Sequence, residues 1–475
     1  MVRIEGSLMK KTIRLILLLT VLIAMVSTGA ISQSTQLDQR ASKIKELIQE
    51  RVERHHQEFG LIVGIVSERG RQIIKYGKQC REGKAVDGST LFELGSVTKV
   101  FTSILLADMI TQGEMNLDDS IEKFLPPEAK VPARGDAKIS LLHLATHTSG
   151  LPNTPHSKTG DESEPGYVNF TKHKLYGFLS NYTLSRKPGT QFEYSNLGFG
   201  LLGHLLSLKT GKSYDRLVEE RICRPLGMND TLRELRPEMN ERLAVGYFLD
   251  GQQARRYPMP PVLAGAGGLR SSANDMLSFL AANMGLDSSP LFTAMQETHK
   301  GRFSISKDVV KVGFSWIVVK GEDIHIVLHG GATDGYRAFI GFDPKEKIGV
   351  VVLANFEDTI DDIGFYALTG KQEILKLGDY EGKPQQVHVD PRIYDDYTGK
   401  YQTTPSFFIS VTREGDRLFA QATGQPKFEL LPESESAFFL KAVRAKIIFE
   451  RDSNGKVYRL IVRSSEGDEI SKKIE

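Results

Sequence analysis

The sequence predicts an α+β fold, with an antiparallel sheet flanked by helices and a helical subdomain, followed by a small C-terminal all-β domain. Strand patterns at 61–76 and 312–354 stand at the two ends of a helical middle, so we expect both to contribute to one sheet. From Pro391 onward short alternating strands recur over about 85 residues, a normal length for an independent core. This second domain is expected to be barrel-like.

The composition is that of an ordinary soluble globular protein. Of the 475 residues, 40% are hydrophobic and 25% charged, and 61 Lys and Arg against 59 Asp and Glu give a net charge of +2. This balance leaves no electrostatic case for a nucleic-acid partner. The length allows one large and one smaller domain, which we place at 31–378 and 391–475, joined by a polar linker at 379–390.

Residues 1–30 have the pattern of a secretory signal peptide. A basic stretch around Lys10 precedes an apolar run at 15–26, and small residues lead to expected cleavage near Ala30. The run is shorter than the roughly 20 apolar residues of a spanning helix, so no stable membrane anchor is expected after cleavage. We therefore expect an exported protein, either periplasmic or secreted.

Hydrophobic spacing predicts the elements in order. Helical spacing over 37–52 indicates an amphipathic helix, Leu61–Ser67 and Arg71–Tyr76 a strand pair, and the mostly apolar stretch from Ser96 to Ile110 a core helix. Further helices are expected at 141–150, 171–180, 198–209 and 213–223, near Ser272 and at 362–377. A polar loop at 152–166 is long enough for a rim or lid. Turn residues separate the meander strands Val312–Val319, Ile324–Leu328, Tyr336–Phe342 and Ile348–Ala354.

Ser96 opens the apolar helix, and Lys99 follows one turn later. Residues i and i+3 share a helix face, so the lysine amine can take the proton of the serine hydroxyl. A helix start also has unpaired backbone N–H groups, which can stabilise an oxyanion. The Ser-x-x-Lys spacing occurs at five other places. Ser96 differs from these in its apolar setting, where a lysine is costly without partners.

Two further motifs supply the groups that a serine nucleophile needs, namely a base, an amide that orients the substrate and a strand edge that holds the acyl group. Tyr194-Ser-Asn196 places a phenol and a carboxamide at i and i+2, which point the same way in an extended loop. The competing Tyr167-Val-Asn169 lies in the long polar loop, with nothing rigid to position it. His329-Gly-Gly-Ala332 follows an apolar strand, where glycines let a substrate backbone approach and the Ala332 N–H can point inward.

Together these motifs resemble a known family. Ser96-Val-Thr-Lys99, Tyr194-Ser-Asn196 and His329-Gly-Gly331, in this order, resemble the class C serine β-lactamases and the related penicillin-binding D-alanyl peptidases and esterases. The flanking His147–Pro152 and Gly267–Ser272 look like the same family, and the resemblance spans Val52 to Leu377. It implies a β-lactamase/transpeptidase-like fold. The C-terminal domain resembles the lipocalin-like appendages of some members.

The resemblance also implies a function and a site. It implies a serine hydrolase that cleaves a β-lactam or D-alanyl peptide amide bond through an acyl-enzyme, without metal or organic cofactor and with a small-molecule or peptide substrate as its partner. The implied residues are the nucleophile Ser96, the proton carriers Lys99 and Tyr194, the substrate-binding Asn196, His329, Gly330 and Gly331, and the oxyanion-hole N–H groups of Ser96 and Ala332.

One departure concerns the charge on the substrate strand. The family's β-lactamases usually carry Lys-Thr-Gly where this chain has His329-Gly-Gly. The literal Lys-Thr-Gly at 158–160 and 209–211 lies in a loop and at a helix end, so we interpret both as decoys. A histidine titrates near neutral pH, so recognition of a substrate carboxylate is expected to vary across roughly pH 5.5 to 7.5. Arg337 is another candidate cation, although a surface arginine is the usual interpretation.

Alternatives from other classes stay open. A carboxylesterase for small acyl esters fits the same motifs, and a non-catalytic binder of cell-wall peptides would keep the cleft without the chemistry. An α/β-hydrolase is disfavoured because no Gly-x-Ser-x-Gly occurs. His143 and His147 have the i, i+4 spacing of a zinc pair, but Leu144 stands where a zinc peptidase carries glutamate, so structural histidines are expected. The sequence does not distinguish Met1 from Met9 as the start, and it fixes neither the pairing of Cys80 with Cys223 nor the oligomeric state.

Overall fold

The computed structural model describes residues 39–53, 59–154, 167, 169–255, 258–306, 309–322, 324–371, 387, 389–404, 407–423, 427–440, 445–452, 454–464 and 467–474. The chain separates into two compact units, the first of Met1–Asn153 with Thr171–Gly370 and the second of Thr154–Phe170 with Lys371–Glu475. The expected signal peptide at 1–30, most of the loop at 152–166 and most of the linker at 379–390 lie outside the described residues.

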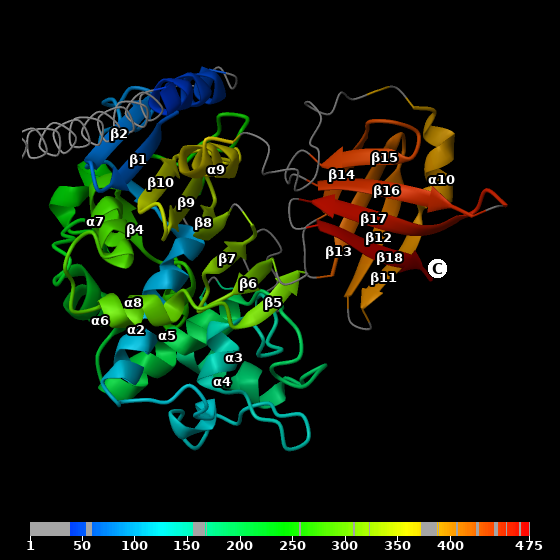
Figure 1. Ribbon diagram of the computed structural model, residues 1–475. Coiled ribbons are helices and arrows are strands. Elements are labelled where there is room, and N and C mark those ends of the chain that lie inside the picture. The colour runs from blue at the N-terminus through cyan, green and yellow to red at the C-terminus, as the bar shows by residue number, and fades with distance from the viewer. Residues whose placement is uncertain are drawn as a thin grey trace, which may run out of the picture. The chain divides into compact units, whose positions relative to one another are not determined.

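An eight-stranded antiparallel sheet forms the centre of the first unit (Figure 1). Its order is β2-β1-β10-β9-β8-β7-β6-β5. The strands are β1 (Leu61–Ser67), β2 (Gly70–Tyr76), β5 (Phe303–Ser306), β6 (Val310–Val312), β7 (Ile317–Lys320), β8 (His325–Thr333), β9 (Tyr336–Asp343) and β10 (Ile348–Ala354). Because β1 pairs with β10, the early and late segments share one sheet, and this prediction is confirmed.

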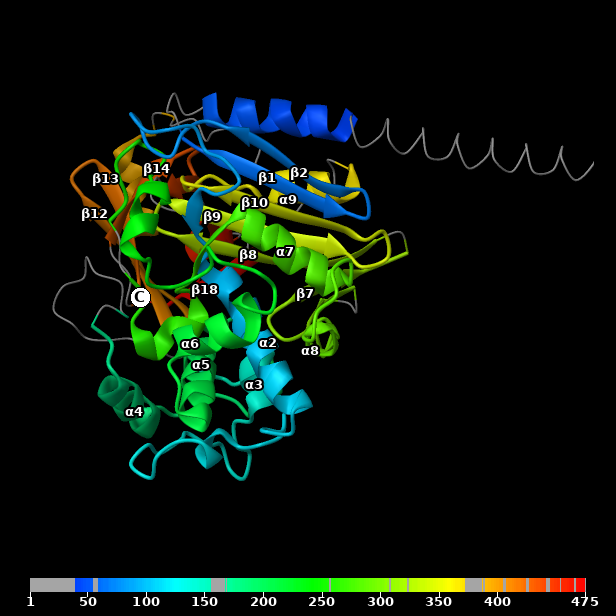
Figure 2. The same ribbon diagram turned by 90° about the vertical axis from the view of Figure 1, so that its left-hand side faces the viewer.

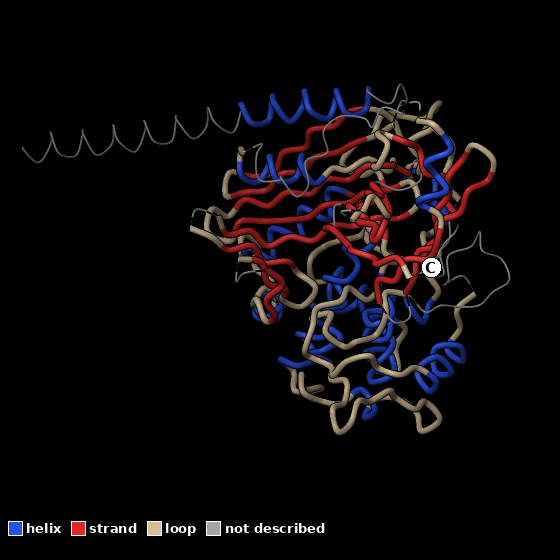
Figure 3. Tube along the Cα trace, turned by 90° about the vertical axis from the view of Figure 1, so that its right-hand side faces the viewer, coloured by secondary structure: helices blue, strands red, loops and turns tan. Residues whose placement is uncertain are grey.

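Helices cover both faces of this sheet. Helix α7 (Ala273–Met284) packs on β1 and β10, and α9 (Asp361–Thr369) packs on β9 and β10 from the other side (Figures 1 and 2). Residues 39–53 are helical and lie beside α9, where Arg40 donates to the carbonyl oxygens of Ala367 and Leu368 at 3.2 Å each. Figure 3 shows this helix along one edge of the stacked strands.

The helical subdomain surrounds a central helix, α2 (Thr98–Thr111). Every residue of α2 from Thr98 to Met109 is buried, which explains why its sequence has no polar face. The other helices of this unit are α3 (Leu141–Ala145), α4 (Lys172–Asn181), α5 (Asn196–Thr210), α6 (Tyr214–Val218) and α8 (Phe292–Thr298). The 3₁₀ turns η1 (Gly95–Val97) and η5 (Pro261–Ala266) pack against this core.

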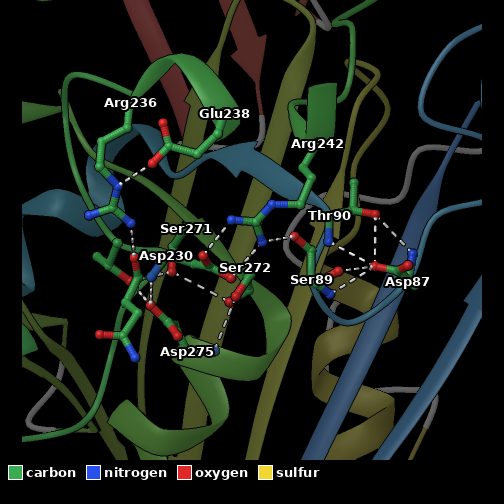
Figure 4. Close-up of polar contacts among 12 residues, drawn as sticks. Asp87, Ser89, Thr90, Asp230, Arg236, Glu238, Arg242, Ser271, Ser272 and Asp275 are labelled. Atoms are coloured by element: carbon green, nitrogen blue, oxygen red, sulfur yellow. Dashed lines mark hydrogen bonds and ion pairs between the residues drawn. The ribbon is translucent and has the colours of Figure 1, made fainter. Parts of the chain in front are cut away.

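A partly buried polar cluster contacts the chain just before the Ser96 turn (Figure 4). It surrounds β4 (Arg270–Ser272), which pairs with β3 (Leu91–Glu93), and we call it the β4 cluster. The Arg242 guanidinium donates two bonds to the carboxylate of Asp230, at 2.8 and 2.6 Å. The carboxylate of Asp275 accepts the backbone N–H of Asp230 and the hydroxyl of Thr231, both at 2.8 Å. Because β3 leads directly into η1, this cluster holds the approach to Ser96.

Three predicted elements of the first unit are wrong in detail. The helix expected at 141–150 ends at Ala145, because the backbone leaves the helical conformation and His147 adopts a φ of 56°. The stretch Val312–Val319 is not one strand, because the chain turns between β6 and β7 with Ser315 at a φ of 63°. The helix expected at 362–377 is interrupted, since Gly370 adopts a φ of 69° and caps α9 after Thr369, and its remaining part at 372–377 lies outside the described residues. Strand β5, at the sheet edge, was not predicted from the sequence.

The second unit is a closed eight-stranded antiparallel barrel, which confirms the predicted all-β domain. Its strands are β11 (Gly399–Thr404), β12 (Phe407–Glu414), β13 (Arg417–Ala422), β14 (Lys427–Pro432), β15 (Ala437–Leu440), β16 (Ala445–Arg451), β17 (Val457–Ser464) and β18 (Gly467–Lys473). The short helix α10 (Tyr394–Tyr397) precedes them. Apolar and aromatic residues such as Tyr401, Phe438 and Phe449 fill the core.

The two cysteines and the helices also bear on the expectations from the sequence. Cys80 and Cys223 are both free thiols in the structure. Among the described residues, none of the helices has the length and apolar character needed to cross a bilayer.

Candidate active site

The Ser96 turn lies directly against strand β8. Gly95 has a φ of 50°, and a Cβ there would stand 2.6 Å from the carbonyl oxygen and 2.7 Å from the nitrogen of Ala332. A Cβ at Gly331 would stand 2.1 Å from the carbonyl oxygen of Leu94. Only glycine fits at both positions. The two backbone segments predicted to supply oxyanion-hole N–H groups, at Ser96 and Ala332, are therefore neighbours.

Lys99 is buried at the centre of the site and is 0% exposed. Its Nζ lies 3.0 Å from Ser96 Oγ, 2.6 Å from Asn196 Oδ1 and 2.6 Å from the carbonyl oxygen of Ala266. All three partners are neutral groups. Burial therefore lowers the pKa of Lys99 well below its ordinary value, because no counter-charge offsets the lost hydration of the ammonium.

The predicted tyrosine motif comes together with Ser96 and Lys99. The Tyr194 ring centroid is 4.8 Å from Lys99 Nζ, and Asn196 is the first residue of α5. Ser195 caps this helix, since its hydroxyl accepts the N–H of Gly198 at 2.8 Å and donates to the carbonyl of Pro152 at 2.7 Å. The competing Tyr167 and Asn169 take part in none of these contacts.

The carboxamide of Asn196 is held in one orientation. Its Oδ1 accepts from Lys99 at 2.6 Å, and its Nδ2 donates to Asn153 Oδ1 at 2.8 Å. The backbone carbonyl of Asn153 also accepts the N–H of Leu197 at 3.0 Å. One hydrogen on Asn196 Nδ2 is left over from these bonds, as the predicted contact with a substrate amide requires.

The structure overturns the expectation that His329 titrates near neutral pH. The residue is 5% exposed, and its Nδ1 lies 2.6 Å from the carbonyl oxygen of Gly330 and therefore carries the proton. Burial, with a smaller effect from nearby Lys99, lowers the pKa of His329 to about 3. The ring is neutral in the working range of pH and carries no charge for a substrate carboxylate.

Arg337 is partly buried rather than a solvated surface residue. It stands opposite Ala332 in the β8–β9 register. Its Nη1 donates to the carbonyl oxygens of Thr333 at 3.2 Å and Tyr336 at 2.9 Å. Burial lowers the pKa of Arg337 from its ordinary value. Its guanidinium is thus engaged by the backbone beside the predicted oxyanion strand.

The remaining sequence candidates have structural partners. His143 Nδ1 accepts the N–H of Ser140 at 3.1 Å, and His147 Nδ1 accepts the N–H of Ser195 at 3.0 Å. Among the described residues no three His, Cys, Asp or Glu side chains converge as metal ligands. The Lys-Thr-Gly at 209–211 ends α5, with Gly211 at a φ of 69°. The copy at 158–160 lies outside the described residues.

Two parts of the site were not predicted from the sequence. The carbonyl of Ala266, at the end of η5, contacts Lys99, but any residue type can supply a carbonyl. Asn153 orients Asn196, yet it follows the motif His147–Pro152 as one polar residue among many. Only the Gly-rich stretch around Ala266 was a usable signal, since it permits close packing against α5. There Gly265 and Gly203 approach so that an added Cβ would stand 2.9 Å from the facing Cα.

Comparison with known proteins identifies the family of the chain. The family model described as Beta-lactamase matches residues 44–367, and that of a domain of unknown function, DUF3471, matches 383–473. The D-alanyl-D-alanine-carboxypeptidase/endopeptidase AmpH of Escherichia coli (strain K12) is 30% identical over 330 residues, which cover 64% of this chain and 83% of that protein. Penicillin-binding protein 4* of Bacillus subtilis (strain 168) is 27% identical over 405 residues, covering 78% and 84%.

Solved structures agree with this likeness. A class C beta lactamase from Rhodobacter sphaeroides superposes with a TM-score of 0.60 at 28% identity, covering 70% of this chain and 98% of that one. The D-alanine carboxypeptidase AmpC from Burkholderia cenocepacia gives a TM-score of 0.61 at 25% identity, covering 70% and 99%. The chain therefore belongs to the beta-lactamase family, and it is an enzyme of the serine hydrolase type that its motifs predict.

Proposed function

We propose that this protein hydrolyses a β-lactam or the terminal amide bond of a D-alanyl peptide through an acyl-enzyme on Ser96. One observation carries the proposal above all others. Lys99 is fully buried and forms no ion pair with any of the described residues, and its Nζ lies 3.0 Å from Ser96 Oγ. An amine kept neutral beside a serine hydroxyl is what base-assisted nucleophilic attack requires.

The hydrogen bonds of Lys99 support a direction for proton transfer. A neutral amine has two N–H groups and one lone pair, whereas the oxygens of Asn196 and Ala266 can only accept. Both oxygens lie 2.6 Å from Nζ and so engage the two N–H groups. The lone pair is then left for Ser96, whose hydroxyl donates to it. Lys99 is in this way arranged as a base.

The reaction follows from these positions. Ser96 Oγ forms a bond to the substrate carbonyl carbon while its proton passes to Lys99. The N–H groups of Ser96 and Ala332 stabilise the oxyanion of the tetrahedral intermediate. Collapse breaks the carbon–nitrogen bond, and Tyr194 passes the proton from Lys99 to the leaving nitrogen. Water then hydrolyses the Ser96 ester, which releases the acid product and restores the serine.

The rest of the site is proposed to hold the acyl group. The free hydrogen on Asn196 Nδ2 donates to an amide carbonyl of the substrate. His329, Gly330 and Gly331 form the strand along which the substrate backbone lies, because the glycines leave room for close approach. The names of relatives, a D-alanyl-D-alanine-carboxypeptidase and several β-lactamases, support this substrate class.

A carboxylesterase is the second candidate, and a specific observation favours it. His329 is neutral where the related β-lactamases usually have a lysine, so a substrate carboxylate finds no fixed charge at this position. Small acyl esters need no such charge. The same Ser96 acyl-enzyme would serve, with an alcohol in place of an amine as the leaving group.

We also propose that the protein works outside the cytoplasm. The basic, apolar and small-residue pattern of 1–30 supports export into the periplasm or the medium. The proposed domain division is 31–378 for catalysis, 379–390 as linker and 391–475 for the β domain. Edman sequencing of protein recovered from the medium or periplasm tests the cleavage near Ala30, and an intact leader there contradicts it.

The first test is the mass of the intact protein during incubation with a penicillin, compared with the Ser96→Ala variant. We expect a penicilloyl adduct on the wild type alone. Its lifetime separates peptidase-like trapping from β-lactamase turnover. Ser103 lies on α2, the helix that follows the Ser96 turn, and is buried with its hydroxyl donating to the Lys99 carbonyl, so Ser103→Ala is the matched control and should keep the adduct.

Each other outcome is informative. An adduct that persists in Ser96→Ala removes Ser96 as nucleophile. If neither adduct nor β-lactam loss occurs, a chromogenic ester is tested next, and its hydrolysis by the wild type alone supports the esterase. If the ester also survives, the chain binds without catalysis and the proposal is wrong.

A further inference from the structure

His147 contacts three consecutive residues, Glu193, Tyr194 and Ser195, the last two of which begin the tyrosine motif. Its carbonyl accepts the N–H of Glu193 at 2.8 Å, and its Nδ1 accepts the N–H of Ser195 at 3.0 Å. Between these two bonds its ring stacks on the ring of Tyr194, with centroids 4.5 Å apart and planes at 27°. One residue therefore fixes the backbone on both sides of Tyr194 and the ring itself.

The backbone of His147 is in an uncommon conformation. Its φ is 56°, in the left-handed region that non-glycine residues seldom occupy. Such strain persists only where the surroundings hold it, and it gathers at functional sites. Here the strained turn follows α3 directly and aims both the carbonyl and the ring of His147 at residues 193–195.

The His147 ring can accept a hydrogen bond at Nδ1 only when the imidazole is neutral. Because Nδ1 accepts a backbone N–H, the proton of the neutral ring is on Nε2, which is buried without a hydrogen-bond partner among the described residues. His147 is 2% exposed, and burial lowers its pKa well below the ordinary value. An unpaired buried N–H is unfavourable. An apolar ring would avoid it, so the imidazole contributes through Nδ1.

We propose that His147 is a positioning residue that holds the Tyr194 phenol where it can carry the proton to the leaving group. This inference rests on the proposed function, in which Tyr194 does that work. The sequence indicates only a structural histidine at this position. A displacement of a catalytic group by about 1 Å lowers a rate by about 100-fold, so a clamp on three successive residues matters to the chemistry.

The test separates two contributions of His147, the hydrogen bond accepted at Nδ1 and the stacking of its ring on Tyr194. His147→Phe keeps an aromatic ring against Tyr194 but removes the Nδ1 acceptor. His147→Asn removes the ring but places Oδ1 where Nδ1 was, and asparagine tolerates a positive φ. His143 is the matched control, because its Nδ1 also accepts a backbone N–H, that of Ser140, at the other end of α3. His143→Phe removes the same kind of bond.

Two acyl donors report on proton delivery. Acylation by penicillin requires a proton on the leaving nitrogen, whereas p-nitrophenyl acetate loses a phenolate that needs none. For His147→Phe we expect about a 30-fold slower acylation by penicillin and less than about a 3-fold change with the ester. For His147→Asn, the rate of acylation by penicillin should lie within about 5-fold of the wild-type rate. His143→Phe should change both rates by the same small factor.

Other results overturn the inference. Equal losses with both donors in His147→Phe mean general damage to the site, and unchanged rates mean that Tyr194 needs no clamp. If His147→Phe does not fold, as judged by circular dichroism, His147→Gln replaces it, because its oxygen reaches beyond the Nδ1 position. Wild type that reacts with neither donor contradicts the proposed function itself. Wild type that reacts only with the ester moves the comparison to ethyl butyrate, whose alkoxide also needs a proton.

Discussion

Two polar regions of the first unit, one partly buried around Arg242 and one fully buried around Lys99, differ in how they accommodate charge. In the β4 cluster, the Arg242 guanidinium meets the Asp230 carboxylate at 2.6 and 2.8 Å (Figure 4). In the candidate active site, Lys99 has only neutral partners. Hydrogen bonding and ionic pairing raise the pKa of Arg242, whereas burial lowers that of Lys99. The first region keeps its charges, and the second favours the neutral amine.

The contrast between the two regions separates groups that stabilise the fold from groups that can react. A paired charge is inert and holds segments together, here the strand before Ser96 and the loop around Asp230. A buried titratable group without a counter-charge has a displaced pKa and can exchange a proton near neutral pH. Variants of the two regions should therefore separate cleanly into those that change unfolding and those that change acylation.

The largest effect is expected at Lys99. Lys99→Met should slow acylation of Ser96 by about 1000-fold, because the base is lost while side-chain volume is kept. The free energy of unfolding should change by less than about 1 kcal/mol, since removal of a desolvated amine offsets the loss of its hydrogen bonds. Rapid-quench mass spectrometry and urea unfolding measure the two quantities. Acylation within tenfold of wild type would show that another group acts as the base.

The β4 cluster should show the reverse pattern. Loss of one partner from a buried ion pair costs roughly 3–5 kcal/mol. Because the Arg242 side chain is 33% exposed, we expect about 2 kcal/mol for Arg242→Ala in urea unfolding. Acylation by the folded protein should change less than about 3-fold. The control is Arg236→Ala, which breaks a pair with Glu238 whose side chains are 56% and 69% exposed, and should cost below about 0.5 kcal/mol. Equal costs for both variants would contradict the contrast between buried and exposed pairs.

Asp275 sharpens the comparison because it is a buried acid within the paired cluster. Burial raises the pKa of Asp275 to about 6, although hydrogen bonds from the Thr231 hydroxyl and from the backbone N–H groups of Asp230 and Asn229 oppose this. A folded-state pKa above the unfolded value gives stability that is present below about pH 4 and is lost as pH rises through 6. Asp275→Asn should remove this loss, so its unfolding free energy relative to wild type should rise by up to about 2 kcal/mol from pH 4 to 7.5. A difference independent of pH would place the Asp275 pKa near its ordinary value.

The smallest effect is expected from His329. With its pKa at about 3, the ring stays neutral from pH 5.5 to 7.5. The ratio of kcat/KM for a carboxylate-bearing substrate to that for its methyl ester should therefore vary by less than about 2-fold over this range. Using the ratio cancels the titration of groups that act on both substrates. A tenfold change in the ratio would restore the titrating histidine that the sequence alone suggested.

Prediction from sequence succeeded where local signals carry the information. Apolar runs rich in Val and Ile at Leu61–Ser67 and Ile348–Ala354 predict two strands, and their position at the two ends of a helical middle predicts that they share one sheet, as their pairing confirms. Prediction failed where the backbone conformation of a single residue ends a strand or a helix. The turn at Ser315 splits an apolar stretch that reads as a single strand, and Gly370 ends α9 although helical spacing continues. Neither conformation is evident from apolar periodicity.

The chemical groups of the candidate site can be identified from the sequence, because residue type and spacing are local properties of the chain. Their protonation states depend on tertiary packing. Lys99 meets partners 97 and 167 residues away, and these contacts with its burial set its pKa. His329 changes from an expected pH-dependent cation to a neutral ring for the same reason. Burial is a property of all segments packed around a group, so no local pattern contains it.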